Sequence, residues 1–365
     1  MMFTFFSKQD WFLNCALLFL AGCSLTILSS IDRALFLPQL IWFLIAFGLM
    51  QAIAFVDWQP FFNYRWIVFG VYLSAVLLLA ATFFFAPTIR EARSWLVFGP
   101  VQFQTSEFAK LALIILFSYF FARSHVGIAR VGVLAKSFIY FAIPAAFVLK
   151  QPDLGSTIII FSIWAGFLLV SGIQWKHLII GLVLLSVLGV FGWTSFLRTY
   201  QKERIIAFLN PSYSPLRINY GVIQSKIAIG SAGFFGKGYG QGTQVQLGFL
   251  PAAETDFIFA AFVEEWGGLG GVLVLGAFVL MLLRIVKIGL DANNNFSKLI
   301  CLGAVIMFLA QFAINIGSTL GLAPVIGVTF PFFSYGGSSI LINAMLLGII
   351  QSIVLRASFL RNSYD

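Results

Sequence analysis

The sequence is poor in charged residues: Asp, Glu, Lys and Arg together make up 10% of its 365 residues. Soluble domains carry about 25% charged residues, and disordered chains combine high net charge with few apolar side chains. This scarcity therefore excludes a soluble enzyme and a disordered chain. Hydrophobic residues fill 60% of the sequence instead, about 11 times the roughly 20 residues that one membrane-spanning helix needs.

Cysteine and histidine are also scarce, with three and two residues respectively. Cys15, Cys23 and Cys301 lie in separate apolar stretches and form no CxxC pair, so we expect neither a disulfide framework nor a thiolate metal site. His125 and His177 stand beside short basic loops and form no metal-ligand pattern. The sequence thus predicts no metal centre and identifies no cofactor, and it leaves open whether a divalent cation takes part.

Acidic residues are fewer than basic ones, 13 against 22, which gives a net charge of +9. In a soluble protein such an excess would indicate a nucleic-acid partner. Membrane proteins collect Lys and Arg in their cytoplasmic loops for a different reason, the positive-inside rule. Because the apolar content already predicts a membrane protein, we expect no nucleic-acid partner here.

Apolar stretches divide the sequence into ten predicted membrane-spanning helices. We expect them at residues 11–30, 34–56, 66–86, 107–122, 134–149, 155–172, 177–197, 256–283, 299–320 and 337–356. Leu20-Ala21-Gly22-Cys23 resembles a lipoprotein cleavage box, but apolar residues continue beyond it, so we expect the first span to be retained. With no fixed-period repeat, the pattern predicts a single all-α polytopic membrane domain over residues 1–365.

The distribution of Lys and Arg predicts the orientation of these helices. An even number of spans places both termini on one side, and we take that side as the cytoplasm. The eleven basic residues of its short loops are Lys8, Arg65, Arg123, Arg130, Lys136, Lys176, Arg284, Lys287, Lys298, Arg356 and Arg361. The four on the opposite side are Arg33, Arg90, Arg93 and Lys150. This bias predicts cytoplasmic termini and an extracytoplasmic location for segment 198–255, between the seventh and eighth spans.

Segment 198–255 is longer than a simple connection and rich in positive charge. It carries six basic and two acidic residues, a balance of +4: Arg198, Lys202, Arg204, Arg217, Lys226 and Lys237 against Glu203 and Glu254. Loops of this length in a compact protein are usually functional, and this charge suits an anionic ligand. Segment 321–336 is uncharged and contains Pro324 and Pro331, which predicts irregular backbone that returns into the protein.

Six glycines crowd residues 230–242, but their spacing excludes two nucleotide-binding motifs. A P-loop requires Gly five residues before its Gly-Lys pair and Ser or Thr after it, whereas Gly236-Lys237 has Ser231 and Gly238 there. A dinucleotide GxGxxG that begins at Gly238 would need its third glycine at Thr243. We therefore expect no nucleotide-driven transport.

Acidic residues within or beside the spans are candidates for function, because charge is costly in a membrane. These are Glu107, Asp153, Asp256, Glu264 and Glu265. Asp256 and Asp153 have a structural alternative as acids at helix N-termini, and Glu107 has one as an i,i+3 ion pair with Lys110. Glu264 and Glu265 must find partners inside the protein, and the adjacent Gly267-Gly268 predicts close contact with another helix.

Five motifs occur in order along the chain. They are Ser106-Glu107-Phe108-Ala109-Lys110-Leu111, Gln151-Pro152-Asp153-Leu154-Gly155-Ser156, Gln224-Ser225-Lys226, the run from Phe249-Leu250-Pro251 through Thr255-Asp256-Phe257 to Glu264-Glu265, and Pro331-Phe332-Phe333-Ser334-Tyr335-Gly336-Gly337-Ser338-Ser339. In this combination the chain resembles the RodA/FtsW/SpoVE (SEDS) family of bacterial cell-wall synthesis. The ten-helix topology of that family agrees with the span count above.

The resemblance is greatest to the RodA, or elongation, branch, because of the short N-terminus, Asp10-Trp11 and the run from Gly242 to Leu247. The chain departs from the family pattern at Thr105, at Ala253-Glu254 and at Gly317-Ser318. None of these departures removes a charged position of the motifs, so the resemblance still implies an active enzyme.

The resemblance implies a peptidoglycan glycosyltransferase of the bacterial inner membrane, with its active site facing the periplasm. Such an enzyme polymerises lipid II into glycan strands during cell-wall elongation and cell-shape maintenance, and it releases undecaprenyl pyrophosphate. The implied partners are lipid II, the growing glycan strand, a class B penicillin-binding protein with transpeptidase activity, and other membrane proteins of the elongation complex. The alternatives are a lipid II flippase and a scaffold that holds a cell-wall partner.

This chemistry assigns roles to particular residues. Attack of an acceptor hydroxyl on the anomeric carbon needs a carboxylate base, and the departing pyrophosphate needs cations. The resemblance places Asp256 at the family's required acid, as the catalytic residue. The substrate-binding candidates are Arg204, Arg217, Lys226, Arg90, Arg93, Lys110, Glu107, Asp153, Gln224 and Ser334. For each cation, anchoring to lipid headgroups is an equal alternative, and for Ser334 a role in shaping the backbone is favoured.

The predicted orientation can be tested with reporter fusions. A reporter that is active only in the cytoplasm should function when fused after Asp365, because an even number of spans returns the chain to the side of the N-terminus. A periplasm-dependent reporter inserted in segment 198–255 should also be active. Activity of a C-terminal reporter only outside the cytoplasm would contradict this orientation.

Overall fold

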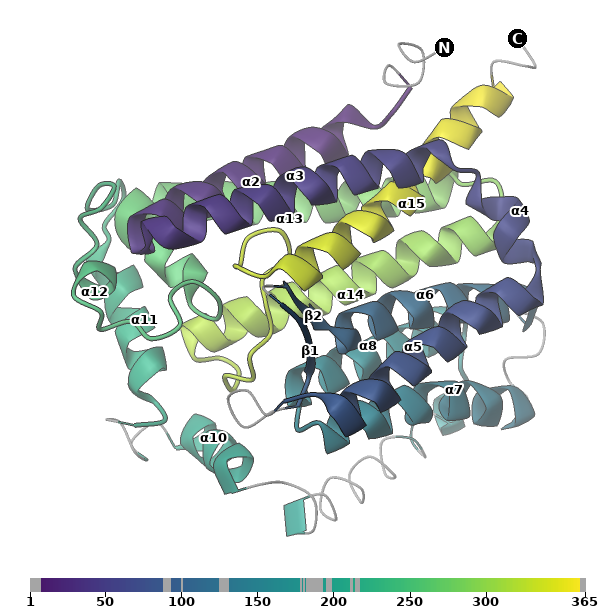
Figure 1. The fold of residues 1–365 in the computed structure, drawn as a ribbon, viewed down its shortest axis with the longest axis horizontal. Helices are drawn as coiled ribbons and strands as arrows, with labels where there is room; N and C mark the ends of the chain where they lie inside the picture. The colour runs from purple at the N-terminus through teal and green to yellow at the C-terminus, as the bar shows by residue number, and fades with distance from the viewer. Residues whose placement is uncertain are drawn as a thin grey trace.

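A computed structural model of the chain describes residues 8–87, 93–99, 101–124, 131–177, 179, 181, 193–194, 199–210, 213 and 217–361. Helices dominate these residues (Figure 1). They are α2 (Trp11–Ile31), α3 (Arg33–Phe55), α4 (Trp58–Asn63), α5 (Arg65–Phe85), α6 (Thr105–Ser124), α7 (Val131–Lys150), α8 (Leu154–Val170), α10 (Thr199–Leu209), α11 (Tyr220–Ser231), α12 (Thr243–Gln246), α13 (Ile258–Asp291), α14 (Asn295–Leu320) and α15 (Gly337–Arg361).

The observed helices confirm an all-α polytopic membrane protein. Eight of the described helices are long and apolar enough to cross a membrane, and α8 is a shorter apolar helix. These nine (eight plus one) coincide with nine of the ten predicted spans to within a few residues at most ends. The remaining predicted span, residues 177–197, lies largely outside the described residues.

One short hairpin interrupts the helices and was not predicted. Strands β1 (Trp95–Phe98) and β2 (Val101–Gln104) pair antiparallel, with Trp95 opposite Gln104. Each strand has four residues, which is too short for a pattern of alternating apolar residues to stand out in the sequence. The hairpin leads directly into α6, which begins at Thr105.

The first and last spans are joined by hydrogen bonds at one end of the bundle. Asp10 caps α2 by accepting from Leu13 N, and its own amide donates to Gln351 Oε1 of α15 at 2.9 Å. Arg284 of α13 donates to the Asp10 carboxylate at 2.6 Å. The described ends of the chain therefore lie together at one end of the bundle (Figure 1).

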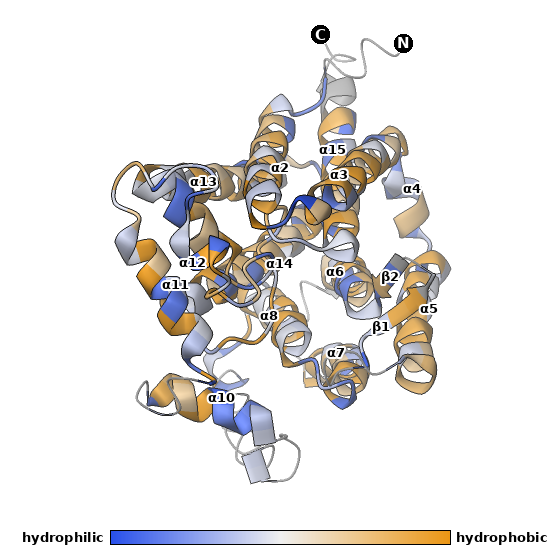
Figure 2. Cartoon of the chain, turned by 60° about the vertical axis from the view of Figure 1, so that its left-hand side comes forward, coloured by the Kyte–Doolittle hydropathy of each residue, from blue (hydrophilic) through white to orange (hydrophobic). Residues whose placement is uncertain are grey.

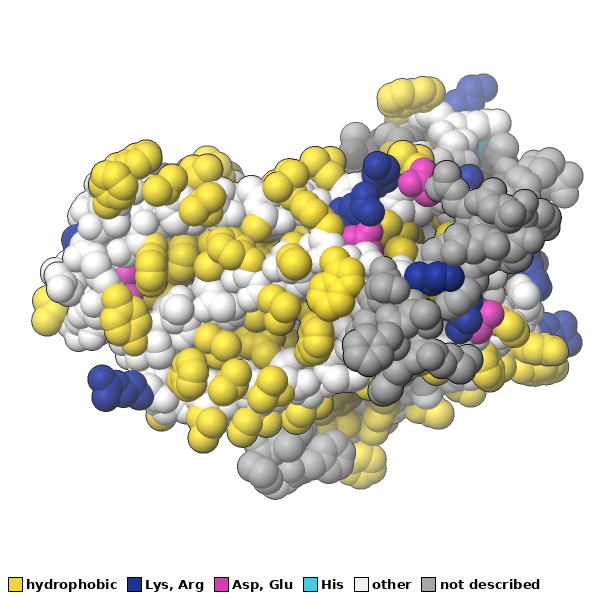
Figure 3. Space-filling model, turned by 90° about the horizontal axis from the view of Figure 1, so that it is seen from above, with side chains coloured by type: hydrophobic (Ala, Val, Ile, Leu, Met, Phe, Trp, Pro, Cys, Tyr) yellow, Lys and Arg dark blue, Asp and Glu magenta, His cyan; other side chains and the backbone are white. Residues whose placement is uncertain are grey.

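The outer surface of the bundle is apolar. Leu44, Leu77, Phe84 and Phe85 are each at least 60% exposed. Figure 2 shows the long helices largely in hydrophobic colours, with hydrophilic residues in α10 and α11. On the face in Figure 3, hydrophobic side chains cover a broad band between charged side chains near its two ends. Such a surface suits the hydrocarbon of a bilayer.

The chain between α14 and α15 consists of bends and turns that pack inside the bundle. Phe330, Phe332 and Phe333 are at most 1% exposed. The ring of Phe330 lies edge-on to Phe278 of α13 and Phe312 of α14, with ring centroids 5.1 and 5.4 Å apart. The predicted irregular backbone of segment 321–336 is thus present, and its buried part around Phe330 packs against α13 and α14.

Helix α13 is interrupted at Gly267, which has φ 74° and ψ 179°. The glycine-rich loop lies against this break: Gly268 N donates to Gly233 O, and Lys237 N donates to Glu264 O, both at 3.0 Å. A Cβ atom at Gly267 would collide with Phe234 O. The expected contact of Gly267-Gly268 with another helix is therefore wrong, because the interrupted backbone bonds to a loop.

A buried ion pair fastens the same loop to α13. Lys237 Nζ lies 2.7 Å from Glu264 Oε1, and the Glu264 side chain is fully buried. The same oxygen accepts from Thr243 Oγ1 at 3.1 Å and from Gln244 N at 3.0 Å. Glu265 accepts from the hydroxyl of Ser30 at the end of α2. Both acids therefore have partners inside the protein, as expected from their positions within a membrane span.

The Lys237–Glu264 pair predicts a large stability effect. Lys237→Met leaves the fully buried Glu264 carboxylate without its cation. Loss of one partner costs about 3–5 kcal/mol in fully buried pairs, and we expect a smaller cost here because the Lys237 side chain is 24% exposed. We expect a clear drop in the unfolding midpoint of the protein in detergent. The double variant Lys237→Met/Glu264→Gln should recover much of it, since no charge stays buried.

Lys298→Met is the matched control, because Lys298 is exposed on α14. Its unfolding midpoint should stay near that of the unaltered protein. An equal drop for Lys237→Met and Lys298→Met would contradict a stabilising role of the ion pair.

Candidate functional site

A half-open cavity of about 240 Å³ lies at the end of the bundle opposite to the described chain ends (Figure 1). Helices α10 and α11, the turn 251–257 and the beginning of segment 321–336 form its walls. Four of the predicted site residues line it together: Asp256, Arg204, Arg217 and Lys226. These residues are up to 52 positions apart in the sequence (256 minus 204), so only the fold brings them to one place.

Asp256 lies in a tight turn directly before α13. Ala252 adopts the left-handed conformation, with φ 47°, and its carbonyl accepts the N–H groups of Thr255, Asp256 and Phe257 at 3.1–3.2 Å. Helix α13 begins at Ile258 with Phe257 as its N-cap, and no side chain caps it. The alternative of Asp256 as a capping acid is therefore not observed. Its half-buried side chain lines the cavity instead.

Arg204 projects from α10 across the mouth of the cavity. Its guanidinium donates to Val325 O at 3.0 Å and lies 5.6 Å from the ring centroid of Tyr200. Two of its contacts are thus with the protein, which holds the planar group in a fixed orientation. Arg217, in the turn before α11, is a second cationic side chain of the cavity wall.

Lys226 reaches the cavity from α11 and lies against the end of α14. Gly321 caps α14 in the left-handed conformation, and a Cβ atom there would lie 2.5 Å from Lys226 Nζ. The C-terminus of a helix carries partial negative charge, which favours a nearby ammonium group. Gly321 therefore provides both the turn that ends α14 and the space that Lys226 occupies.

The charges of the cavity add to +2, from three cations and one carboxylate among its lining residues. All three cations are exposed, so solvent and salt partly screen them, but their excess over the single carboxylate still favours an anionic ligand. The same site presents a carboxylate that can accept a proton. The arrangement therefore suits proton removal from a nucleophile beside a negatively charged leaving group.

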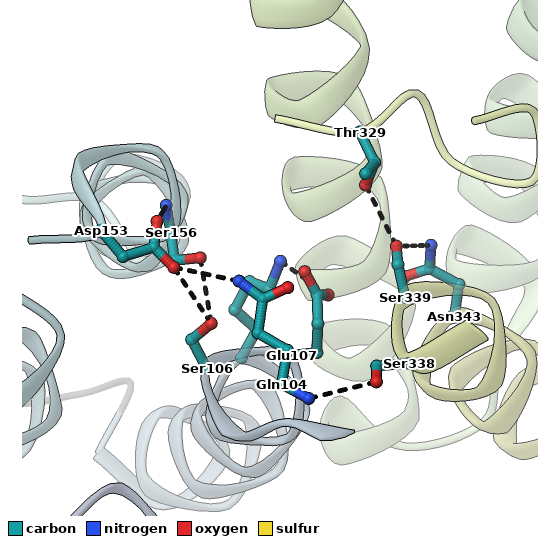
Figure 4. A network of polar contacts seen from close by, with 10 residues as sticks. Gln104, Ser106, Glu107, Asp153, Ser156, Thr329, Ser338, Ser339 and Asn343 are labelled. Atoms are coloured by element: carbon teal, nitrogen blue, oxygen red, sulfur yellow. Dashed lines mark hydrogen bonds and ion pairs between the residues drawn. The ribbon is translucent and has the colours of Figure 1, made fainter. Parts of the chain in front are cut away.

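Glu107 and Lys110 lie elsewhere, in the interior of the bundle. Lys110 Nζ is 2.7 Å from Glu107 Oε2, and the residues are 1% and 4% exposed respectively. The predicted i,i+3 ion pair is thus confirmed. Figure 4 shows Glu107 within a network of polar contacts, and neither Glu107 nor Lys110 lines the cavity.

Asp153 belongs to the same network and caps α8. Its Oδ1 accepts from Ser156 N at 2.9 Å, and its Oδ2 accepts from Gln104 Nε2 at 3.0 Å (Figure 4). The N-cap interpretation is therefore confirmed for Asp153. The backbone N–H of Gln104 donates to Ser338 Oγ at 3.1 Å, and this bond connects the hairpin to the start of α15.

The remaining candidates do not line the cavity. Gln224 lies half-buried on α11, and Ser334 is 3% exposed and bonded to backbone groups. Arg93 is exposed next to the hairpin, and Arg90 lies outside the described residues. In the part of the chain that the structure describes, no three His, Cys, Asp or Glu side chains form a group that could hold a metal ion.

Two buried residues near the cavity were not predicted from the sequence as site residues. Asn315 and Thr319 of α14 are at most 1% exposed, and their side chains donate to Asp256 O at 3.3 and 3.4 Å. Their i,i+4 spacing, which continues the one from Gln311, places polar groups on one face of a mainly apolar helix. That pattern is the signal that would have identified them.

Comparisons with known proteins point to one family. A family model for cell cycle proteins, which covers FtsW, RodA and SpoVE, matches residues 10–358. The peptidoglycan glycosyltransferase MrdB of Helicobacter pylori strain J99 is 36% identical over 331 residues, covering 88% of this chain and 84% of its own. MrdB of Escherichia coli K12 is 34% identical over 316 residues, covering 85% and 83%.

Solved structures have the same fold. A chain of a peptidoglycan synthase complex, studied for its coordination of polymerization and crosslinking, matches with a TM-score of 0.81 at 30% identity. The match covers 96% of this chain and 98% of that one. The rod shape determining protein RodA of Thermus thermophilus matches with a TM-score of 0.70 at 27% identity, covering 98% of each chain.

The contact between Lys226 and Gly321 predicts a selective loss of anion binding. Gly321→Ala strains the left-handed backbone by about 1–2 kcal/mol and also displaces the Lys226 ammonium. We expect the affinity for inorganic pyrophosphate, measured by calorimetry, to fall about tenfold, the effect of one lost charge-assisted hydrogen bond.

Gly327→Ala is the matched control, since Gly327 has nearly the same φ, 72°, but no atom within 4 Å of its added Cβ. It should lose similar stability and keep its affinity for pyrophosphate. Equal affinities of the two variants would show that Gly321 does not position Lys226.

Proposed function

The chain belongs to the FtsW/RodA/SpoVE family, and we propose that it acts as a peptidoglycan glycosyltransferase with Asp256 as its general base. The curated relatives above are named for this activity, and the chain shares at least 34% of their residues over most of its length. The observation that carries the site assignment is that Asp256 shares one cavity with three cationic side chains.

Glycosyl transfer from a lipid-linked donor requires a proton acceptor beside the attacking hydroxyl. As the acceptor oxygen bonds to the anomeric carbon, its proton passes to Asp256, and the bond from that carbon to the pyrophosphate breaks. Asp256 suits this step because it is half-buried, lines the cavity and caps no helix. A half-buried carboxylate in a cavity can accept the proton of a hydroxyl that lies within hydrogen-bond reach.

The departing pyrophosphate requires positive charge in the place where negative charge develops. Arg204, Arg217 and Lys226 line the same cavity as Asp256 and are the proposed cations for this step. Because Arg204 is already bonded to Val325 O, its charge is oriented before the substrate arrives. Preorganised charge of this kind stabilises a transition state without a further cost of rearrangement.

The chain is a multi-pass membrane protein, and we propose that its cavity faces the periplasm with both termini in the cytoplasm. The bias of Lys and Arg in the short loops supports this orientation, and the joined chain ends opposite to the cavity are consistent with it. The proposed substrate is lipid II, together with the growing glycan strand.

We also propose a class B penicillin-binding protein as a partner, alongside other membrane proteins of the elongation complex. Crosslinking of the new glycan requires a transpeptidase, and the similar chain in the peptidoglycan synthase complex comes from a study of polymerization coordinated with crosslinking.

The rival function, lipid II flipping, needs a polar route through the depth of the membrane. One charged pair deep in the described bundle, Glu107 and Lys110, is 4% and 1% exposed, and its two charges neutralise one another. The cavity, by contrast, holds its charges at one end of the bundle. This distribution favours polymerisation at one surface over transport.

Asp256→Asn tests the proposed base, because the amide keeps the size of the side chain but cannot accept the proton. Polymerisation of lipid II by the purified protein, followed as glycan products on a gel, should fall about 100-fold or more. The unfolding midpoint should stay close to that of the unaltered protein.

Glu254→Gln provides a matched control, since Glu254 is a half-buried acid of the same turn and is not part of the cavity wall. It should polymerise lipid II at a nearly unchanged rate. If Asp256→Asn is as active as Glu254→Gln, the assignment of Asp256 is wrong and Asp153 becomes the next candidate.

A further inference from the structure

The backbone around Asp256 is held from outside its own turn. The carbonyls of Glu254, Thr255 and Asp256 all accept hydrogen bonds from other parts of the chain. Tyr335 N donates to Glu254 O at 2.9 Å, and Ser334 Oγ donates to Thr255 O at 2.7 Å. Asp256 O accepts from Asn315 and Thr319 of α14, as described above.

The hydroxyl of Ser334 has a fixed direction. It also accepts from Phe330 N at 2.9 Å, and Phe330 O in turn accepts from Ser334 N at 3.0 Å, which closes a tight turn over residues 330–334. With one acceptor and one donor engaged, the hydroxyl has no freedom to rotate to another partner. Ser334 is 3% exposed and does not line the cavity, so it is placed to act on the turn and not on a ligand.

The turn that carries Ser334 is itself rigid. Phe333 and Phe330 contact each other with ring centroids 5.2 Å apart, and Phe333 also lies edge-on to Phe262 of α13 at 5.4 Å. These rings are fully or almost fully buried, and close-packed interiors resist small displacements. A continuous set of contacts therefore connects the aromatic core to the carbonyl that precedes Asp256.

We infer that Ser334 is a positioning residue, which holds the 254–256 backbone so that the Asp256 carboxylate points into the cavity. This inference rests on the proposed function of Asp256 as the general base. It gives a specific task to Ser334, for which the sequence favoured a role in shaping the backbone over substrate binding. Asn315 of α14 supports the same backbone, since it donates both to Asp256 O and to Val328 O, at 3.3 and 2.8 Å.

Ser334→Ala removes the hydrogen bond to Thr255 O and should leave the cavity lining intact. Displacement of a catalytic group by a fraction of an ångström to one ångström lowers the rate by about 10- to 100-fold. We expect kcat for lipid II polymerisation to fall in this range while KM stays nearly constant. Ser334→Thr, which keeps the hydroxyl, should recover part of the loss.

The matched control is Ser339→Ala. Ser339 lies close by in the chain, is 7% exposed, and forms its hydrogen bonds with Thr329 and Asn343, away from the turn of Asp256. Its removal should cost similar stability without lowering kcat. A second measurement, amide hydrogen exchange of residues 252–257 in detergent, should be faster in Ser334→Ala than in Ser339→Ala.

The outcomes separate this inference from the proposed function. Normal kcat together with unchanged exchange at 252–257 in Ser334→Ala would overturn the positioning role, even if Asp256→Asn is inactive. Full activity of Asp256→Asn would overturn the proposed base, whatever the exchange rates are. If Ser334→Ala does not fold, Ser334→Cys keeps the volume with a much weaker donor, and the same two measurements decide on that variant.

Discussion

A polar backbone group that is removed from water must find a partner within the protein, and this constraint shapes every irregular part of the chain. The break in α13 at Gly267 frees amides and carbonyls, and the glycine-rich loop bonds to them. The turn before α13 leaves three carbonyls facing away from itself, and Ser334, Tyr335 and α14 supply the donors. Hydrogen bonds to other parts of the chain thus hold these two irregular segments in place.

Charged side chains also need partners, and they are balanced in the interior of the bundle but not in the cavity. Inside the bundle, Lys110 pairs with Glu107, and Lys237 pairs with Glu264, so the interior carries these charges in neutral pairs. In the cavity, three cations outnumber one carboxylate. Unbalanced charge is retained where a ligand can compensate it, and the pyrophosphate of a lipid-linked sugar is an anion of the required kind.

The two regions are connected through the chain between α14 and α15. At one point Ser334 bonds to the turn of Asp256, and four residues later Ser338 bonds to the hairpin that leads to Glu107 and Asp153. The family motif around these serines therefore serves to hold backbone in both regions. This role suits the serines of the motif, because a small hydroxyl group bonds to a carbonyl without displacing the packed aromatic rings around it.

The sequence by itself determined the class of protein, most span boundaries and the ion pair of Glu107 with Lys110, because these depend on apolar stretch length or on neighbours within one helix. It also identified Asp256 and Lys226 as candidates through motifs that stand in order along the chain, and Arg204 and Arg217 through the positive charge of segment 198–255. It could not reveal the hairpin, the loop partner of Gly267, or the donors from Asn315 and Ser334 to the turn of Asp256. Those contacts join residues about 30 to 80 positions apart or rest on very short strands, and no local periodicity records them. Tertiary packing alone decided which polar groups meet in the cavity and which are neutralised inside the bundle, because distance in space, not spacing in sequence, sets each hydrogen bond and ion pair.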